Sequence, residues 1–250
     1  MFGSIDRDKI LLDLDKLRLN YFVDTRPRLA EGAIKHLHRG LLVRINMLED
    51  SVVVLDDELQ RANGPLNSYL ATRLTLLINA YYLNLSGSLD NLAWAIAYHH
   101  CLWDPIDEND RKQRRNVQLM GKEFLKAIAK SNLGELEQFL CTLRDWYWDM
   151  REFRDPAAHR IPILVPCALY SESDVKEMER LDSESANAIE KGDRAAAREA
   201  FHKSTSVGQQ MPIFISESTS QHFYDLAARI NQDHLNWHSI VEATLREGFK

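Results

Sequence analysis

The chain has 250 residues and a net charge of −6, with 45% hydrophobic and 27% charged residues. These proportions are typical of a folded globular protein that buries a substantial core, and they argue against large-scale disorder. Glycine and proline are scarce, at 10 and 7 residues, which favours long helices over a turn-rich β fold. The negative charge argues against a protein that coats nucleic acid without specificity.

The cysteines and the N-terminus predict the compartment. Cys101, Cys141 and Cys167 form neither a CxxC pair nor an even-numbered framework, which predicts a reducing environment and no structural zinc. The N-terminal sequence MFGSIDRDKILLDLDK lacks the basic start and apolar stretch of a secretion signal. No apolar run approaches the ~18 residues of a membrane span. We therefore expect a cytoplasmic protein with no membrane partner.

Two long helices are predicted first along the chain. Between 30 and 63, apolar residues from Ile34 to Leu59 recur in steps of three and four, as on one face of a helix in a bundle. After the turn signal NGP at 63–65, a second such pattern extends from about Leu66 to His100. Its small and polar residues would let another helix approach closely, and the polar ones need partners if buried. These residues are Asn84, Ser88, Asn91 and Ala95.

Shorter elements are predicted after this pair. Residues 104–115 read as an exposed loop, followed by helices at roughly 119–130 and 133–154. Prolines and β-branched residues make 161–169 and 211–216 extended, so that the two can pair, and a charged helical hairpin over 172–204 turns at 191–193. Serine and threonine at 218–220 are expected to cap a last helix. Its predicted buried face is Phe223, Ala227, Ile230, His234, Trp237 and Val241.

These elements together predict one all-α domain over 1–250. Its architecture is expected to be an up-and-down helical bundle. Residues 161–217 form an excursion from the bundle, in which extended segments flank the helical hairpin.

Arg154 interrupts the apolar pattern of the helix predicted at 133–154. That pattern consists of Leu133, Leu136, Leu140, Leu143, Tyr147 and Met150. The next step of four reaches Arg154, so its guanidinium is expected to face a neighbouring helix or a second subunit. Pro156 then predicts that the helix stops at Asp155, and that Asp155 and Pro156 start a short new turn over 156–160.

A stop at this point would bring Arg154 and His159 together. Residues five apart on an unbroken helix diverge by ~140°, and a break relieves that constraint. Arginine binds phosphoryl oxygens through a planar fork, and histidine transfers protons near neutral pH, so the pair suits a phosphodiester. The alternative is structural, with Arg154 paired to an acidic neighbour and His159 capping the helix C-terminus.

Basic residues are concentrated around this pair. Residues 111–160 contain eleven Lys/Arg and seven Asp/Glu, a balance of +4, so the rest of the chain carries −10. The segment either binds an anionic partner or forms a solvated loop and a salt-bridged helix face, and the sequence leaves both open.

The stretch FRDPAAHRIPI resembles the signature of the HEPN superfamily of all-helical domains. That signature is an arginine, a polar residue, three variable positions and a histidine, located late in a helical bundle. Arg154, Asp155 and His159 match it, and Pro156 departs from it. The helix SGSLDNLAWAIAY at 86–98 is similar to the helix before the motif in bacterial members of unassigned function. The resemblance covers about 66–165 and does not extend to 170–217.

The resemblance implies a homodimer whose two motifs face one another, often a metal-independent endoribonuclease of a toxin or defence system with an antitoxin partner. It implies that the RNA 2′-hydroxyl attacks the adjacent phosphorus while His159 transfers the proton and Arg154 stabilises the charged oxygens. Asp155 would orient His159 or cap the turn. Candidate substrate contacts are Arg151, Arg160, Asn91 and Asp90. No metal and no cofactor are expected.

Two other functions stay open. One is a non-catalytic helical module of the same fold that binds a nucleotide, RNA or a protein partner. The other is a structural dimer in which Arg154 pairs with a buried carboxylate. A metal site at His99 and His100 is not predicted, because adjacent histidines on a helix point ~100° apart and suit a helix C-terminus instead.

Overall fold

The chain folds as an all-α helical bundle with one small sheet, as the sequence predicts. The computed structural model describes residues 4–61, 65–159, 163–209, 212–215 and 222–250, with the backbone alone for 156–159. The first half contains α1 (Arg7–Asn20), η1 (Tyr21–Thr25), η2 (Arg26–Arg28), α2 (Glu31–His36), η3 (Leu37–Leu41), α3 (Leu42–Arg61), α4 (Ser68–His99) and α5 (Arg111–Asn116). The second half contains α6 (Lys122–Lys130), α7 (Gly134–Thr142), α8 (Arg144–His159), α9 (Glu172–Glu190), α10 (Arg194–Ser204), β1 (Ile213–Ile215), β2 (Phe223–Asp225) and α11 (Leu226–Glu247).

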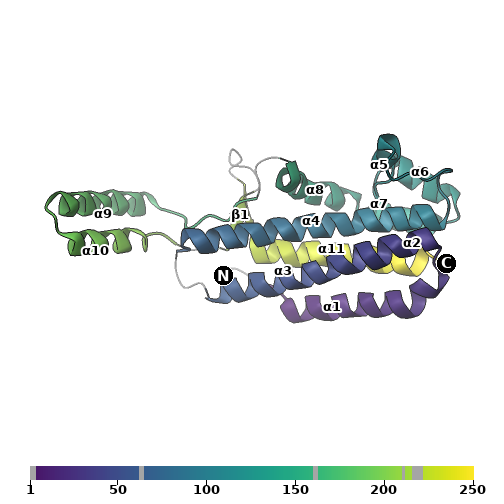
Figure 1. Cartoon of the computed structure of the whole chain (residues 1–250), viewed down its shortest axis with the longest axis horizontal. Helices are drawn as coiled ribbons and strands as arrows, with labels where there is room; N and C mark the ends of the chain where they lie inside the picture. Colours follow the sequence, from purple (N-terminus) through teal and green to yellow (C-terminus); the bar gives the residue numbers. More distant parts are fainter. Residues whose placement is uncertain (1–3, 62–64, 160–162, 210–211, 216–221) are drawn as a thin grey trace.

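The 32-residue helix α4 is the centre of the bundle, about 48 Å long at 1.5 Å per residue. It packs against α2, α3, α8 and α11, while α1 packs on α3 and α11 (Figure 1). Two of the small and polar residues on α4 meet partners, as expected. Asn84 accepts a hydrogen bond from Arg44 of α3 at 3.1 Å, and Ser88 accepts one from the Trp237 indole of α11 at 2.6 Å. These contacts fix how closely α3 and α11 approach α4.

The helix predicted at 30–63 is present as a continuous run of α2, the π-turn η3 and α3. Its expected face is buried, including Leu37, Leu41, Ile45 and Val52. Helix α1 has no counterpart among the predicted elements. Its buried residues Ile10, Leu14 and Leu17 nevertheless follow steps of four and three.

The helix predicted at 133–154 is instead two helices, α7 and α8, separated at Leu143. The prediction that the second of these stops at Asp155 is also wrong, because α8 continues through Pro156 to His159. A proline removes one backbone hydrogen bond, but here it lies in the last turn of the helix. Met150 and Phe153 are buried just before it. Their packing outweighs the local preference for a break.

The hairpin predicted at 172–204 is confirmed as α9 and α10, joined by a turn at Gly192 with φ of 76°. It projects beyond one end of the bundle, and the C-terminus lies at the other end (Figure 1). The flanking segments pair as predicted, through bridges between Leu164 and Ile215 and between Leu169 and Gln209. β1 also pairs antiparallel with β2. The hairpin is thus attached to the bundle by a narrow two-stranded stem.

The last helix and the predicted loop differ from expectation in detail. The N-cap of α11 is Asp225, whose carboxylate accepts the Ala228 N–H at 2.8 Å, and the predicted caps at 218–220 lie outside the described residues. Phe223 is in β2 and is 53% exposed, so it is not part of the helix face. Within the predicted loop 104–115, the basic stretch starting at Arg111 is the short helix α5. No described helix combines the length and the apolar character that crossing a bilayer requires.

Candidate functional site

Arg154 lies at the edge of the buried face of α8 rather than within it. The apolar pattern continues from Met150 by a step of three to Phe153, which is 1% exposed. The Arg154 side chain is 24% exposed and donates from Nη1 to Asp155 Oδ1 at 2.9 Å. Arg154 is therefore half-buried, with part of its guanidinium open to solvent.

Three arginines are near enough for their charges to act on Asp90 of α4, without forming an ion pair with it among the described residues. We call them the arginine cluster: Arg44 of α3 and Arg151 and Arg154 of α8. Arg151 is 14% exposed and lies 3.5 Å from the Asp155 carboxylate. Arg44 lies over Gly87, where a Cβ atom would come within 2.4 Å of the guanidinium carbon. The absence of a side chain at position 87 gives Arg44 its place.

The charges of the cluster act on one another. Burial raises the pKa of Asp90, against the effect of Arg151, Arg154 and Arg44. Burial also acts to raise the pKa of Asp155, but hydrogen bonds from Arg154 and Arg151 and their charges hold it below its usual value. Burial lowers the pKa of Arg44, and the nearby charge of Arg154 acts in the same direction. Three guanidinium groups face two carboxylates, so an excess of positive charge is concentrated at a half-buried place.

Aromatic side chains border the cluster on α8. The Arg151 guanidinium lies 5.8 Å from the ring centre of Tyr147 and 5.6 Å from that of Trp148. Tyr147 is buried, and burial followed by the charge of Asp90 raises its pKa to about 12. Trp148 is 39% exposed. A base or another flat group bound beside Arg151 would have an aromatic face available for stacking.

The structure brings together four of the seven predicted site residues: Arg151, Arg154, Asp155 and Asp90. Asn91 is not part of the cluster, because its amide donates to the Gly87 carbonyl at 2.9 Å and its side chain fills the space above Gly40. These contacts are part of helix packing, and the role of Asn91 as a substrate contact stays a prediction.

The remaining two predicted residues are His159, the last residue of α8, and Arg160. Arg160 and the His159 side chain lie outside the described residues. Position 159 belongs to the same unbroken helix as Arg154, so the two positions are ~140° apart around it. The prediction that a helix break brings them to one surface within a single chain is therefore wrong.

Arg44 is the residue that sequence reasoning missed. It lies next to Ile45 in the sequence and outside the apolar pattern of α3. Nothing in that pattern distinguishes it from a charged residue on the surface. The signal for it was on the other helix: Asn84 belongs to the small and polar row of α4, and Gly87, which that row did not include, lies next to Ser88 of the row. That row predicts that something approaches closely, but not which side chain does so.

A second charged network lies on another face of α8. Asp233 of α11 is fully buried and accepts three hydrogen bonds: from Tyr82 at 2.8 Å, Trp146 at 2.8 Å and Arg229 at 2.9 Å. Arg229 also donates to Asp149 at 2.5 Å. Burial raises the pKa of Asp233, against the charge of Arg229 and these hydrogen bonds. The network ties α4, α8 and α11 together, and its central carboxylate, Asp233, is closed to solvent.

The histidines flagged by the sequence have structural partners. His99 accepts the Ala30 N–H at 3.3 Å, and His100 Nε2 lies 2.9 Å from the Gly248 carbonyl, so the pair joins the end of α4 to other segments. Within the described ranges, no three His, Cys, Asp or Glu side chains gather closely enough to hold a metal ion. A wide cavity of about 860 Å³ lies between Asn132 and Lys250, away from the arginine cluster.

The comparisons with known proteins return no relative. No family model matches the chain, and neither a curated protein nor a solved structure matches it.

Proposed function

We propose that the protein acts on RNA through the arginine cluster and His159, as a HEPN-type endoribonuclease that needs no metal. The observation that carries the proposal is the gathering of Arg44, Arg151 and Arg154 around Asp90. Arginines held in fixed positions suit the oxygens of a phosphodiester, because their planar forks donate in pairs.

The cluster has two properties that a phosphate site requires. Its cations outnumber its carboxylates, so one guanidinium charge is not neutralised within the cluster. Asp155 is 51% exposed, and exposed ion pairs are weak, so an incoming phosphate can displace it from Arg154. The exposed ring of Trp148 beside Arg151 offers a surface for a base.

In the proposed reaction, the 2′-oxygen of the RNA attacks the adjacent phosphorus while His159 accepts the hydroxyl proton. The new oxygen–phosphorus bond forms as the bond to the 5′-oxygen breaks, and the protonated imidazole returns the proton to that leaving oxygen. Arg154 and Arg151 stabilise the negative charge on the phosphoryl oxygens. Because 154 and 159 diverge around α8, the arginine and the histidine of one site would come from two copies facing one another.

The second candidate is a non-catalytic module that binds RNA or a nucleotide at the same cluster. The unbroken α8 favours it, since a single copy then presents Arg154 without His159 beside it. The third function, in which Arg154 only neutralises a buried carboxylate, is less favoured because its hydrogen-bonded partner Asp155 is half exposed.

The deciding experiment incubates purified protein with labelled RNA in the presence of EDTA. The test variants are Arg154→Ala and His159→Ala. Arg144→Ala is the matched control for the first, because Arg144 is an exposed arginine on the same helix. His202→Ala on α10 is the control for the second, since His202 is also exposed.

We expect wild type and both controls to cleave RNA with EDTA present. Both test variants should lose at least ~100-fold in rate, His159→Ala because it removes the general acid–base and Arg154→Ala because it removes stabilisation of the phosphoryl charge. Cleavage that survives in the test variants, or that stops with the chelator, contradicts the mechanism. Binding without cleavage that weakens in Arg151→Ala and Arg154→Ala supports the module instead. Each lost phosphate contact should then reduce the salt dependence of binding by about 0.7 in log–log slope.

A further inference from the structure

The α9–α10 hairpin buries too few large apolar side chains between its two helices to be stable without a further contact. Its buried residues are Leu181, Ala197, Ala200 and Ser204, of which only leucine is large. Helices this short gain most of their stability from the packing of an apolar face. Meanwhile Ile189 is 65% exposed and Phe201 is 58% exposed. Ile189 and Phe201 therefore point away from the interior of the hairpin.

These exposed residues line a shallow groove near the hairpin tip, of about 520 Å³. Ile189, Ala197 and Phe201 form its apolar lining, and Arg194 and Arg198 border it. The groove is apolar with a cationic rim, which fits an amphipathic surface that carries carboxylates.

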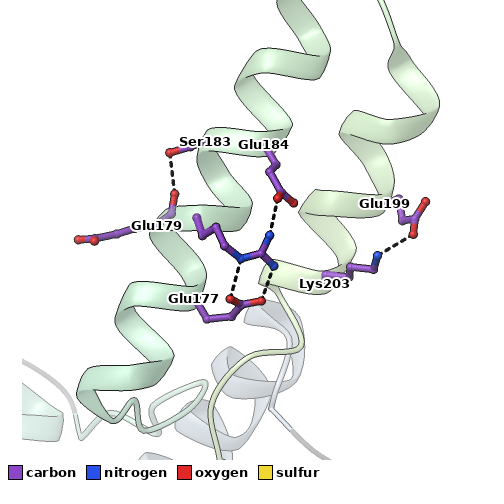
Figure 2. Close-up of polar contacts among 7 residues, drawn as sticks. Glu177, Glu179, Ser183, Glu184, Glu199 and Lys203 are labelled. Atoms are coloured by element: carbon purple, nitrogen blue, oxygen red, sulfur yellow. Dashed lines mark hydrogen bonds and ion pairs between the residues drawn. The ribbon is translucent and has the colours of Figure 1, made fainter.

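The two helices of the hairpin carry opposite charge. α9 has seven carboxylates and two cations, whereas α10 has three cations and one carboxylate. The ion pairs of Arg180 with Glu177 and Glu184, and of Lys203 with Glu199, each lie within one helix (Figure 2).

Other charged residues on both helices have no ion-pair partner among the described residues. Arg194 and Arg198 form no ion pair with any described residue, and the same holds for Glu179 and Glu190 of α9. Because α9 is acidic and α10 is basic, α9 of one copy is complementary in charge to α10 of another.

We propose that the hairpins of two copies of this chain pair into a four-helix bundle, about a two-fold axis parallel to the hairpin. In that arrangement α9 of one copy lies antiparallel to α10 of the other, so that acidic and basic helices alternate around the bundle. The grooves at the two tips close on one another and bury Ile189 and Phe201. The contact is independent of the arginine cluster, and both helical bundles lie at the same end of the paired hairpins.

The test is sedimentation equilibrium of the full chain over a range of concentrations. We expect a dimer for the wild type, and a Kd at least about tenfold higher for the double variant Ile189→Glu and Phe201→Glu. Both side chains are already exposed, so the fold should persist, and an unchanged helical circular dichroism signal checks this. Leu76→Glu is the matched control, because Leu76 is 67% exposed on α4 and lies outside the hairpin. It should leave the dimer intact.

Charge reversal provides a second test. The pair Arg194→Glu and Arg198→Glu should also weaken the dimer, and salt should weaken the wild-type dimer. A wild type that stays monomeric, a dimer unaffected by the groove variants, or a dimer dissociated by Leu76→Glu overturns the proposal. A monomer that instead binds an acidic amphipathic peptide in the groove overturns the second copy as its occupant. None of these results depends on RNA cleavage.

Discussion

Two arginine–carboxylate clusters lie on two faces of α8 and differ in how their charges are satisfied. On one face Asp233 is fully buried, and three donors, Tyr82, Trp146 and Arg229, satisfy its carboxylate. On the other face Arg151 and Arg154 share the half-exposed Asp155 and have charge in excess. The closed network contributes to the fold, whereas the open cluster is available to a ligand. The exposure of the arginines does not distinguish the two clusters, because the arginines of both are largely buried. The exposure of the carboxylates does.

The largest difference between the two clusters is expected when the central carboxylate of each is removed. Asp233→Ala should lower the free energy of unfolding by about 3–5 kcal/mol, because it leaves the Tyr82 and Trp146 donors without an acceptor and Arg229 with Asp149 as its remaining partner. Asp155→Ala should change it by less than about 1 kcal/mol, because its ion pairs are exposed. Urea unfolding followed by circular dichroism measures both. Equal losses in the two variants would show that the open cluster is as structural as the closed one.

The pH dependence of stability should also follow the buried groups rather than the open cluster. Burial, followed by the charge of His238, lowers the pKa of His234 from 6.5 to about 4, against the effect of Asp13. Lys9 of α1 also faces it and lowers the pKa further. The folded chain therefore resists protonation of His234 that the unfolded chain accepts. Stability should be full above pH 6.5 and fall by up to about 3 kcal/mol as the pH drops towards 4.

This prediction is checked by urea unfolding across that range. In His234→Gln the loss of stability between pH 6.5 and 4 should shrink, while His202→Gln, on the exposed face of α10, should keep it. The lowered pKa of Asp155 adds stability that is lost only as the pH falls below the usual aspartate value of 3.8. A variant His234→Gln with an unchanged slope would assign the pH dependence to other groups.

The smallest expected effect on stability comes from Gly87→Ala, which acts on the open cluster alone. The added methyl group would displace the Arg44 guanidinium, the mobile end of its side chain, from Asn84. Alanine favours a helix over glycine by up to about 1 kcal/mol, so the net change in unfolding free energy should stay within about 1 kcal/mol. RNA binding should weaken several-fold if Arg44 contributes to the site. Gly32→Ala, which meets the Tyr98 ring at 2.4 Å, is the contrasting variant and should destabilise without a specific loss of RNA affinity.

The long helices of this chain were predictable because their buried faces repeat without interruption. Ile45, Leu48, Val52 and Leu55 of α3 follow steps of three and four, as do Leu74, Ile78, Tyr81 and Leu85 of α4, and all are buried. The end of α8 was not predictable, because the local effect of Pro156 is opposed by tertiary packing of Phe153 that no window of sequence contains. The same applies at Leu143, where α7 and α8 separate although the apolar pattern continues across the gap.

The candidate site was half predictable. Arg154, Asp155 and Arg151 are close in sequence and appear together as a motif on one helix. Arg44 joins them from α3, and its place depends on Gly87 of α4, more than 40 positions away along the chain. To predict a cluster assembled from three helices, one must know where those helices cross. The repeat of apolar residues along each helix does not specify this.

The stem of the hairpin determines how freely the length of the segment beyond it can change. Leu169 and Gln209 exchange both of their backbone hydrogen bonds, at 2.9 and 3.0 Å, which places their Cα atoms about 5.5 Å apart. A link of a few residues would therefore span the points where the hairpin enters and leaves. The entropy cost of closing the loop between these two points grows only slowly with its length, so a longer or shorter hairpin costs little. We therefore expect the helices on either side to keep their places when the hairpin is shortened, lengthened or replaced by a short link.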